Sequence, residues 1–124
     1  MSGGLLDTSV VLGPPAATLP DEAAISVITL AELRLGVLVA ATTVERSRRL
    51  ERLVELERTY AALPVDDDVA GAYAKIIADE RERGRRPRAM DALIAATALA
   101  RGLTLYTRDR DLAAISGPAV ELVR

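Results

Sequence analysis

The 124-residue sequence contains no histidine and no cysteine. Without histidine, Ser-His-Asp triads and imidazole acid/base pairs are excluded; without cysteine, so are disulfides and thiol nucleophiles, and the two absences together exclude almost every zinc site. Phenylalanine and tryptophan are absent too, so the core must be built from Leu, Val, Ile and Ala. Any catalysis must therefore use carboxylates, hydroxyl groups, arginines or a metal ion.

An excess of positive charge is also missing, because the formal net charge is −2. The chain as a whole is thus not a basic nucleic-acid binder. Half of the residues are apolar, and the length predicts one globular domain over residues 1–124. No cationic leader precedes the first apolar run, and the longest run, 92–100, is far below the ~20 residues that span a bilayer. We expect a cytoplasmic protein without membrane contact.

Short apolar runs alternate with longer segments of helical periodicity. Ser26 and Thr42 are expected N-caps, the latter with Glu45 in a capping box, and Gly102 is an expected C-cap. The alternation predicts a parallel α/β sheet with helices on both faces. The expected strands are 4–6, 23–26, 63–65, 103–106 and 120–122, and the expected main helices are 27–40, 43 to about 62, 69–83 and 90–101.

Acidic residues stand where a strand ends or where a helix is apolar enough to be buried. They are Asp7, Glu32, Asp91 and Asp109, with Asp111 as a fifth candidate. Each also has a structural interpretation: Asp7 and Asp109 can cap helices, and Asp91 can stabilise a helix N-terminus. Glu32 can face solvent, and Asp109 can pair with a neighbouring arginine.

The strand order decides between these interpretations. Ligands of open α/β sheets gather outside the carboxyl ends of the strands. If strands 4–6 and 103–106 are neighbours, Asp7 and Asp109 converge, and helix 90–101 can bring Asp91 to the same edge. Clustered carboxylates repel one another unless a cation compensates, and an oxygen-only donor set favours Mg²⁺, or Mn²⁺ in its place.

Four segments share a recognisable order and spacing along the chain: Leu5–Ser9, Thr29–Gly36, Asp91–Ala98 and Leu105–Leu112. Together they resemble the PIN-domain ribonucleases and, among them, the VapC-type toxins of toxin–antitoxin pairs. The resemblance implies a three-layer α/β sandwich with a central parallel sheet of four to five strands. It implies Asp7, Glu32, Asp91 and Asp109 as the catalytic acids, with Asp7, Asp91, Asp109 and Asp111 as metal ligands. Leu112 stands where the family often has Phe, and the spacing leaves open whether Asp109 or Asp111 faces the metal.

The implied function is Mg²⁺-dependent endoribonuclease activity, in which a metal-activated water hydrolyses a phosphodiester bond. An antitoxin that blocks the acidic pocket and a homodimer are implied as partners. Few aromatic residues leave little base stacking, so selectivity for a structured RNA such as tRNA or rRNA is expected. The candidate substrate contacts are Thr8, Thr107, Arg34 and Arg108. The arginine-rich segment 81–88 is a further candidate, although a solvated connector is the favoured interpretation.

Two other functions fit parts of the pattern. A phosphoacceptor signalling domain also clusters acids at strand ends, but it needs a lysine near the last strand, and the only lysine, Lys75, is expected within a helix. A catalytically silent binding module could keep the fold without the chemistry. Measuring RNA cleavage with Mg²⁺ and with EDTA separates the enzyme from the module.

Overall fold

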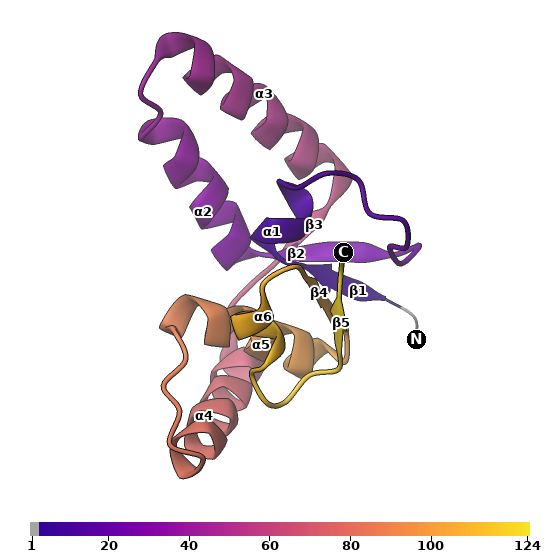
Figure 1. The fold of residues 1–124 in the computed structure, drawn as a ribbon, viewed down its shortest axis with the longest axis vertical. Coiled ribbons are helices and arrows are strands. Elements are labelled where there is room, and N and C mark those ends of the chain that lie inside the picture. Colours follow the sequence, from indigo (N-terminus) through magenta and orange to yellow (C-terminus); the bar gives the residue numbers. More distant parts are fainter. Residues whose placement is uncertain (1–2) are drawn as a thin grey trace.

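A computed structural model describes residues 3–124 as a five-stranded, fully parallel sheet covered by helices (Figure 1). The strand order is β3-β2-β1-β4-β5, so β1 is central, and Leu5 is in register with Ala24 of β2 and Leu105 of β4. This confirms the predicted parallel α/β fold. The strands are β1 (Gly4–Leu6), β2 (Ala23–Ser26), β3 (Ala61–Leu63), β4 (Thr104–Thr107) and β5 (Val120–Leu122).

The helices connect the strands and begin where the sequence places capping residues. The Ser26 hydroxyl accepts from the N–H of Ile28, the Thr42 hydroxyl accepts from Glu45, and Gly102 ends its helix with a φ of 65°. In Figure 1, α2 and α3 form a hairpin that extends away from the sheet. The helices are α1 (Thr8–Val11), α2 (Val27–Leu38), α3 (Thr43–Thr59), α4 (Asp67–Glu82), α5 (Ala89–Arg101) and α6 (Arg110–Ala113).

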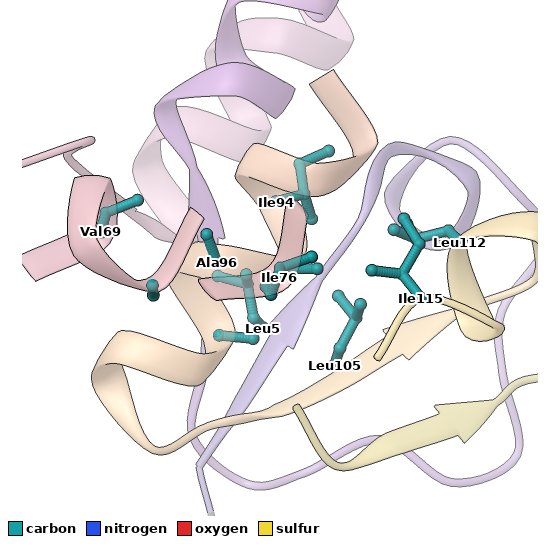
Figure 2. Close-up of a cluster of buried hydrophobic side chains, with 11 residues drawn as sticks. Leu5, Val69, Ile76, Ile94, Ala96, Leu105, Leu112 and Ile115 are labelled. Atoms are coloured by element: carbon teal, nitrogen blue, oxygen red, sulfur yellow. The ribbon is translucent and has the colours of Figure 1, made fainter. Parts of the chain in front are cut away.

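Two hydrophobic cores lie on opposite faces of the sheet. Successive side chains of a strand point to opposite faces, so neighbouring leucines of β1 enter different cores. Leu5 packs with Leu105 and with Ile76 and Ile94 of α4 and α5 (Figure 2). Leu6 packs in the second core, which contains residues from α1, α2 and α3. The fold therefore has three layers.

The helix expected to reach about Ala62 ends earlier, and the following strand is shifted. Helix α3 ends at Thr59, and β3 covers 61–63 instead of 63–65. Pairing of β3 with β2 explains the difference, because Ala61 aligns with Ala24 and an extended backbone is required there. Pro64 also disfavours helical backbone at the residue before it.

The helix lengths limit how the protein could meet a membrane. Across residues 3–124, no helix is both long enough and apolar enough to cross a bilayer.

Candidate active site

The candidate site lies at the carboxyl edge of the sheet, between β1 and β4. From β1 the chain passes to β2 and β3 on one side, whereas β4 and β5 lie on the other side. This reversal makes a topological switch point, where open α/β sheets bind ligands. The N–H of Asp7 donates to the carbonyl of Tyr106 at 3.1 Å, which joins the residue after β1 to β4.

Asp7 is the buried carboxylate of this edge, with 4% of its surface exposed. Its Oδ2 accepts from the Thr107 hydroxyl at 2.6 Å. Its Oδ1 accepts from the Ser9 hydroxyl at 2.7 Å and from the N–H of Val10 at 3.2 Å. The last contact makes Asp7 the N-cap of α1. The capping interpretation and the position at the candidate site therefore both hold for this side chain.

Burial governs the protonation of Asp7. Loss of hydration raises the pKa of this carboxyl, whereas hydrogen bonds from Thr107, Ser9 and Val10 lower it, and the nearby negative charge of Asp109 raises it further. The net shift is upward. A cation held at this edge would lower the pKa of Asp7, and so would offset the upward shift that burial and the charge of Asp109 cause.

Two hydroxyl groups tie the loops after β1 and β4 together. The Thr107 hydroxyl accepts from the N–H of Asp109 at 3.0 Å, and the Ser9 hydroxyl accepts from the N–H of Arg108 at 2.9 Å. Asp109 also caps α6, because its Oδ1 accepts from the N–H of Asp111 at 2.8 Å. Thr107 thus links the Asp7 carboxylate to the backbone that carries Asp109.

Glu32 reaches the same region from α2. The Thr8 hydroxyl donates to Oε1 of Glu32 at 2.7 Å, although the Glu32 side chain is solvent-exposed. Helix α2 starts directly at the carboxyl end of β2, with Ser26 as its N-cap. This start brings Glu32 within hydrogen-bonding distance of the residue that follows Asp7.

Arg88 is a member of the site that the sequence patterns did not single out. It precedes α5, and its guanidinium lies 2.9 Å from Oδ2 of Asp91 and 3.4 Å from Oδ2 of Asp109. The contact with Asp91, and then the charges of Asp109 and Asp111, raise the pKa of Arg88. The spacing of Arg88 and Asp91 is a local signal, but the contact with Asp109 depends on the tertiary fold. Segment 81–88 is mostly exposed, as expected of a solvated connector, and Arg88 at its end is paired with the two carboxylates.

The five acidic candidates are not equally close to one another. Asp91 is largely shielded, with 17% of its side chain exposed, and Arg88 bridges it to Asp109. Asp111 is exposed, and it contacts Asp109 through its backbone N–H, which donates to Oδ1 of Asp109.

Metal binding depends on how closely these carboxylates gather. Within residues 3–124, no group of three or more acidic side chains is gathered closely enough to hold a metal ion. The donor set is nevertheless all oxygen, which fits Mg²⁺ or Mn²⁺. The Arg88 guanidinium occupies Oδ2 of both Asp91 and Asp109, and an ion bound through these two oxygens would compete with it.

The two arginines expected to contact substrate have partners within the protein. Arg34 pairs with Glu57 across the α2–α3 hairpin at 3.5 Å. Arg108 donates to the carbonyls of Ser9 at 3.4 Å and Pro14 at 2.7 Å, and so holds the loop after α1 against the end of β4. Their role in RNA binding stays a prediction.

Comparison with known proteins agrees with this architecture. The sequence matches the PIN domain family over residues 5–118. It is 45% identical to Ribonuclease VapC5 of Mycobacterium tuberculosis (strain ATCC 25618 / H37Rv), covering 99% of this chain and 96% of VapC5. It is 39% identical to Ribonuclease VapC4 of the same strain, covering 96% and 94% of the two chains.

A solved structure is similar over the same extent. The fold superposes with a TM-score of 0.88 on a chain from the crystal structure of VapBC-5, a member of the VapBC family of toxin–antitoxin systems from Mycobacterium tuberculosis. The two chains are 46% identical, and the match covers 100% of this chain and 99% of the other. The parallel sheet and its acidic edge define the class, and the chain belongs to the PIN-domain family and, within it, to the VapC ribonucleases.

Proposed function

We propose that this protein is a Mg²⁺-dependent endoribonuclease toxin that cleaves structured cellular RNA, such as tRNA or rRNA, in the cytoplasm. The carrying observation is the acidic edge at the switch point, where buried Asp7 is hydrogen-bonded to Thr107 and Arg88 pairs with both Asp91 and Asp109. The sequence contains no histidine that could perform acid/base chemistry in its place. Membership in the VapC ribonucleases supports the same reaction.

Carboxylates from different elements would hold the ion. Asp7 and Asp91 are the proposed direct ligands, and Glu32 and Asp109 would complete the shell or orient water, with Asp111 as the alternative to Asp109. When bound, Mg²⁺ lowers the pKa of a coordinated water and neutralises charge on the scissile phosphate. Mn²⁺ is the expected substitute, because it accepts the same oxygen ligands.

The protein's own groups set the geometry of the reaction. Thr107 and Ser9 fix the orientation of the Asp7 carboxylate, and Thr8 fixes that of Glu32. Glu32 is thereby available to orient the attacking water and accept its proton. Attack on phosphorus forms the new P–O bond and breaks the bond to the 3′ oxygen, which takes up a proton from solvent, and the products are a 3′-hydroxyl and a 5′-phosphate.

The predicted substrate contacts act in two ways. Thr8 and Thr107 donate to carboxylates and so contribute by positioning them. Arg34 lies on α2, like Glu32, with 59% of its side chain exposed, which leaves it accessible to a phosphate. Arg108 would contribute mainly by holding the loop that contains Ser9.

A groove between α2 and α3 supports an antitoxin as partner. It has a volume of about 690 Å³, and Glu32, Leu33 and Leu53 are among its lining residues. The hairpin also exposes Leu35 and Leu38. Leu35 and Leu38 do not line the groove itself, but a partner helix that occupies the groove and extends over the hairpin would cover them, and it would lie beside Glu32 of the acidic edge. We also expect a homodimer that uses apolar surfaces of the later helices.

Cleavage of total RNA tests the proposal. We expect purified protein to cut RNA with Mg²⁺, to lose activity in EDTA, and to regain it with Mn²⁺. Sequencing the cut ends identifies the RNA and the type of end. RNA that stays intact under all three conditions would indicate a silent binding module instead.

A further inference from the structure

We propose that a groove formed by α4 and the loop before α5 is the surface on which the RNA backbone docks. This inference rests on the proposed ribonuclease function and names its substrate-binding surface. The groove has a volume of about 420 Å³. We call it the arginine groove, because Arg81, Arg85 and Arg86 line it. Tyr73, Ile77 and Pro87 line it as well.

Charge makes such a surface necessary. The acidic edge repels phosphates, and most nucleic-acid affinity comes from contacts of arginine and lysine with the backbone. Elsewhere in residues 3–124, several arginines are occupied by carboxylates, as Arg49 is by Glu45. The side chains of Arg81 and Arg86, like those of Arg58 and Arg110, form no ion pair or hydrogen bond with any described residue, but Arg81 and Arg86 are the two that line a common groove. Their charges remain available to a ligand.

The loop that forms the groove is anchored to α4 by the buried side chain of Glu80. Glu80 has only 2% of its surface exposed, and its Oε2 accepts from Nη2 of Arg85 at 2.7 Å and from Nε at 3.2 Å. The N–H of Arg85 donates to the Glu80 carbonyl at 2.8 Å, and Gly84 turns the chain with a φ of 72°. Because Arg85 is anchored, binding of a ligand should cost little conformational entropy for ordering the loop.

The groove adjoins the acidic edge along the chain. Arg86 stands two residues before Arg88, whose guanidinium pairs with Asp91 and Asp109. Two residues of extended chain span at most ~7 Å. An RNA strand with its scissile phosphate at the edge can therefore place a following phosphate over the arginine groove.

The remaining lining residues suit a single-stranded segment. Tyr73 is half-buried, packs against the hydrophobic core and lines the same groove as the arginines, and we assign its ring the role of stacking one base or ribose. Arginine binds phosphate in a bidentate manner, which lysine cannot do. Arginine binds carboxylates in the same way, so Tyr73 is the feature that favours RNA over an acidic protein segment.

RNA binding by charge-matched variants tests the inference. The double variant R81Q/R86Q removes the two uncommitted charges, and R58Q/R124Q removes two exposed charges elsewhere. Binding of a fluorescent RNA hairpin with single-stranded flanks is measured by anisotropy in EDTA, at 50 to 200 mM salt. We expect R81Q/R86Q to weaken binding on the order of tenfold and to lower the salt slope by about 1.4, since each single-strand phosphate contact contributes ~0.7. The control variant should bind like the wild type.

The outcomes separate this inference from the proposed function. Thermal unfolding of R81Q/R86Q should stay close to that of the wild type, because neither side chain forms an ion pair or hydrogen bond, and the loss of the Arg81 charge from the last turn of α4 should lower the melting temperature by a few degrees at most. If the wild type binds RNA and R81Q/R86Q binds equally with the same salt slope, the arginine groove is not the docking surface. If R81Q/R86Q kept its RNA affinity but no longer bound an acidic protein that the wild type binds, the arginine groove would be a protein-binding surface, and the inference would be wrong. A wild type that binds no RNA would overturn the ribonuclease proposal as well.

Discussion

At the scale of single residues, the Asp7 carboxylate has two tasks. It caps α1 through Val10, and it stands at the candidate site with Thr107 and Ser9 as donors. The hydroxyls of Thr107 and Ser9 in turn accept from backbone N–H groups of the loop after β4. Structural and chemical roles are therefore combined in one hydrogen-bonded unit, and a test must separate them.

Replacing Asp7 by Asn separates the two tasks. Asn is as good an N-cap as Asp, so we expect the fold to remain. It lacks the negative charge that a metal ligand supplies, so Mg²⁺-dependent RNA cleavage should be abolished. Cleavage assays and circular dichroism measure the two effects, with the exposed residue Asp21 replaced by Asn as the control. Full activity of D7N would contradict the assignment.

At the scale of elements, the close approach of β1 to its neighbours restricts its first residue. A Cβ at Gly4 would lie 2.5 Å from Cγ of Pro20 and 2.7 Å from Cε1 of Tyr106. Gly71 in α4 is the opposite case, because a Cβ there would meet nothing within 4 Å. Alanine at Gly4 therefore tests the effect of overpacking, and alanine at Gly71 tests the effect of helix propensity.

Alanine at these two glycines should change stability in opposite directions. Overpacking at Gly4 should lower the free energy of unfolding by about 1–3 kcal/mol. Alanine at Gly71 should raise it by about 0.5–1 kcal/mol, because glycine is a poor former of helix interiors. Urea unfolding measures both. A Gly4 variant as stable as the wild type would show that the strand start is not tightly packed, and a Gly71 variant without a gain would contradict the helix-propensity argument.

The start of α4 should make stability depend on acid. The N–H of Val69 and, next, the side chain of Arg101 stabilise charged Asp66 and lower its pKa below the ordinary 3.8. A carboxyl with a depressed folded pKa contributes stability above its unfolded pKa and loses it as pH falls through the folded pKa. The advantage of the wild type over D66N should be full above about pH 5 and should shrink below pH 3.8.

Urea unfolding from pH 7 to pH 3 measures this effect. D66N is a suitable comparison, because Asn keeps the cap while it removes the charge that Arg101 contacts. A difference between the two proteins that stayed constant over the whole range would contradict the assignment.

At the scale of the whole molecule, the central position of β1 organises the site. Both cores form around β1, with Leu5 in one and Leu6 in the other, and Asp7 follows directly at the carboxyl edge. Pairing of β1 with β4 brings residues about one hundred positions apart into hydrogen-bonding distance, as in Asp7 and Thr107. The site is thus assembled by the global fold and should respond to its ligand as a unit.

Metal binding should stabilise the folded protein as a whole. An ion that binds the native state and not the unfolded state raises the free energy of unfolding, by about 2.7 kcal/mol at one hundred times its dissociation constant. We expect added Mg²⁺ to raise the melting temperature of the wild type and to have no effect on D7N. Differential scanning calorimetry in EDTA and in Mg²⁺ measures the shift. Equal shifts for both proteins would place the ion outside the acidic edge.

The sequence by itself determined the chemistry that is open to this protein and most of its local structure. The absence of histidine and cysteine left carboxylates, hydroxyl groups, arginines or a metal ion as the groups that any catalysis could use. The helix start at Ser26, the capping box at Thr42 and the helix end at Gly102 were predictable, since each depends on hydrogen bonds or backbone angles within a few residues.

Only the tertiary structure decided what depends on distant partners. Helix α3 ends at Thr59 because β3 pairs with β2, which the periodicity of the helix does not encode. The pairing of Arg88 with Asp109, and of Asp7 with Thr107, requires β4 to lie beside β1. Strand order is set by burial of both sheet faces at once, and this is a property of the whole chain. The sequence thus specifies which residue types stand at the acidic edge, whereas tertiary packing brings these residues close together.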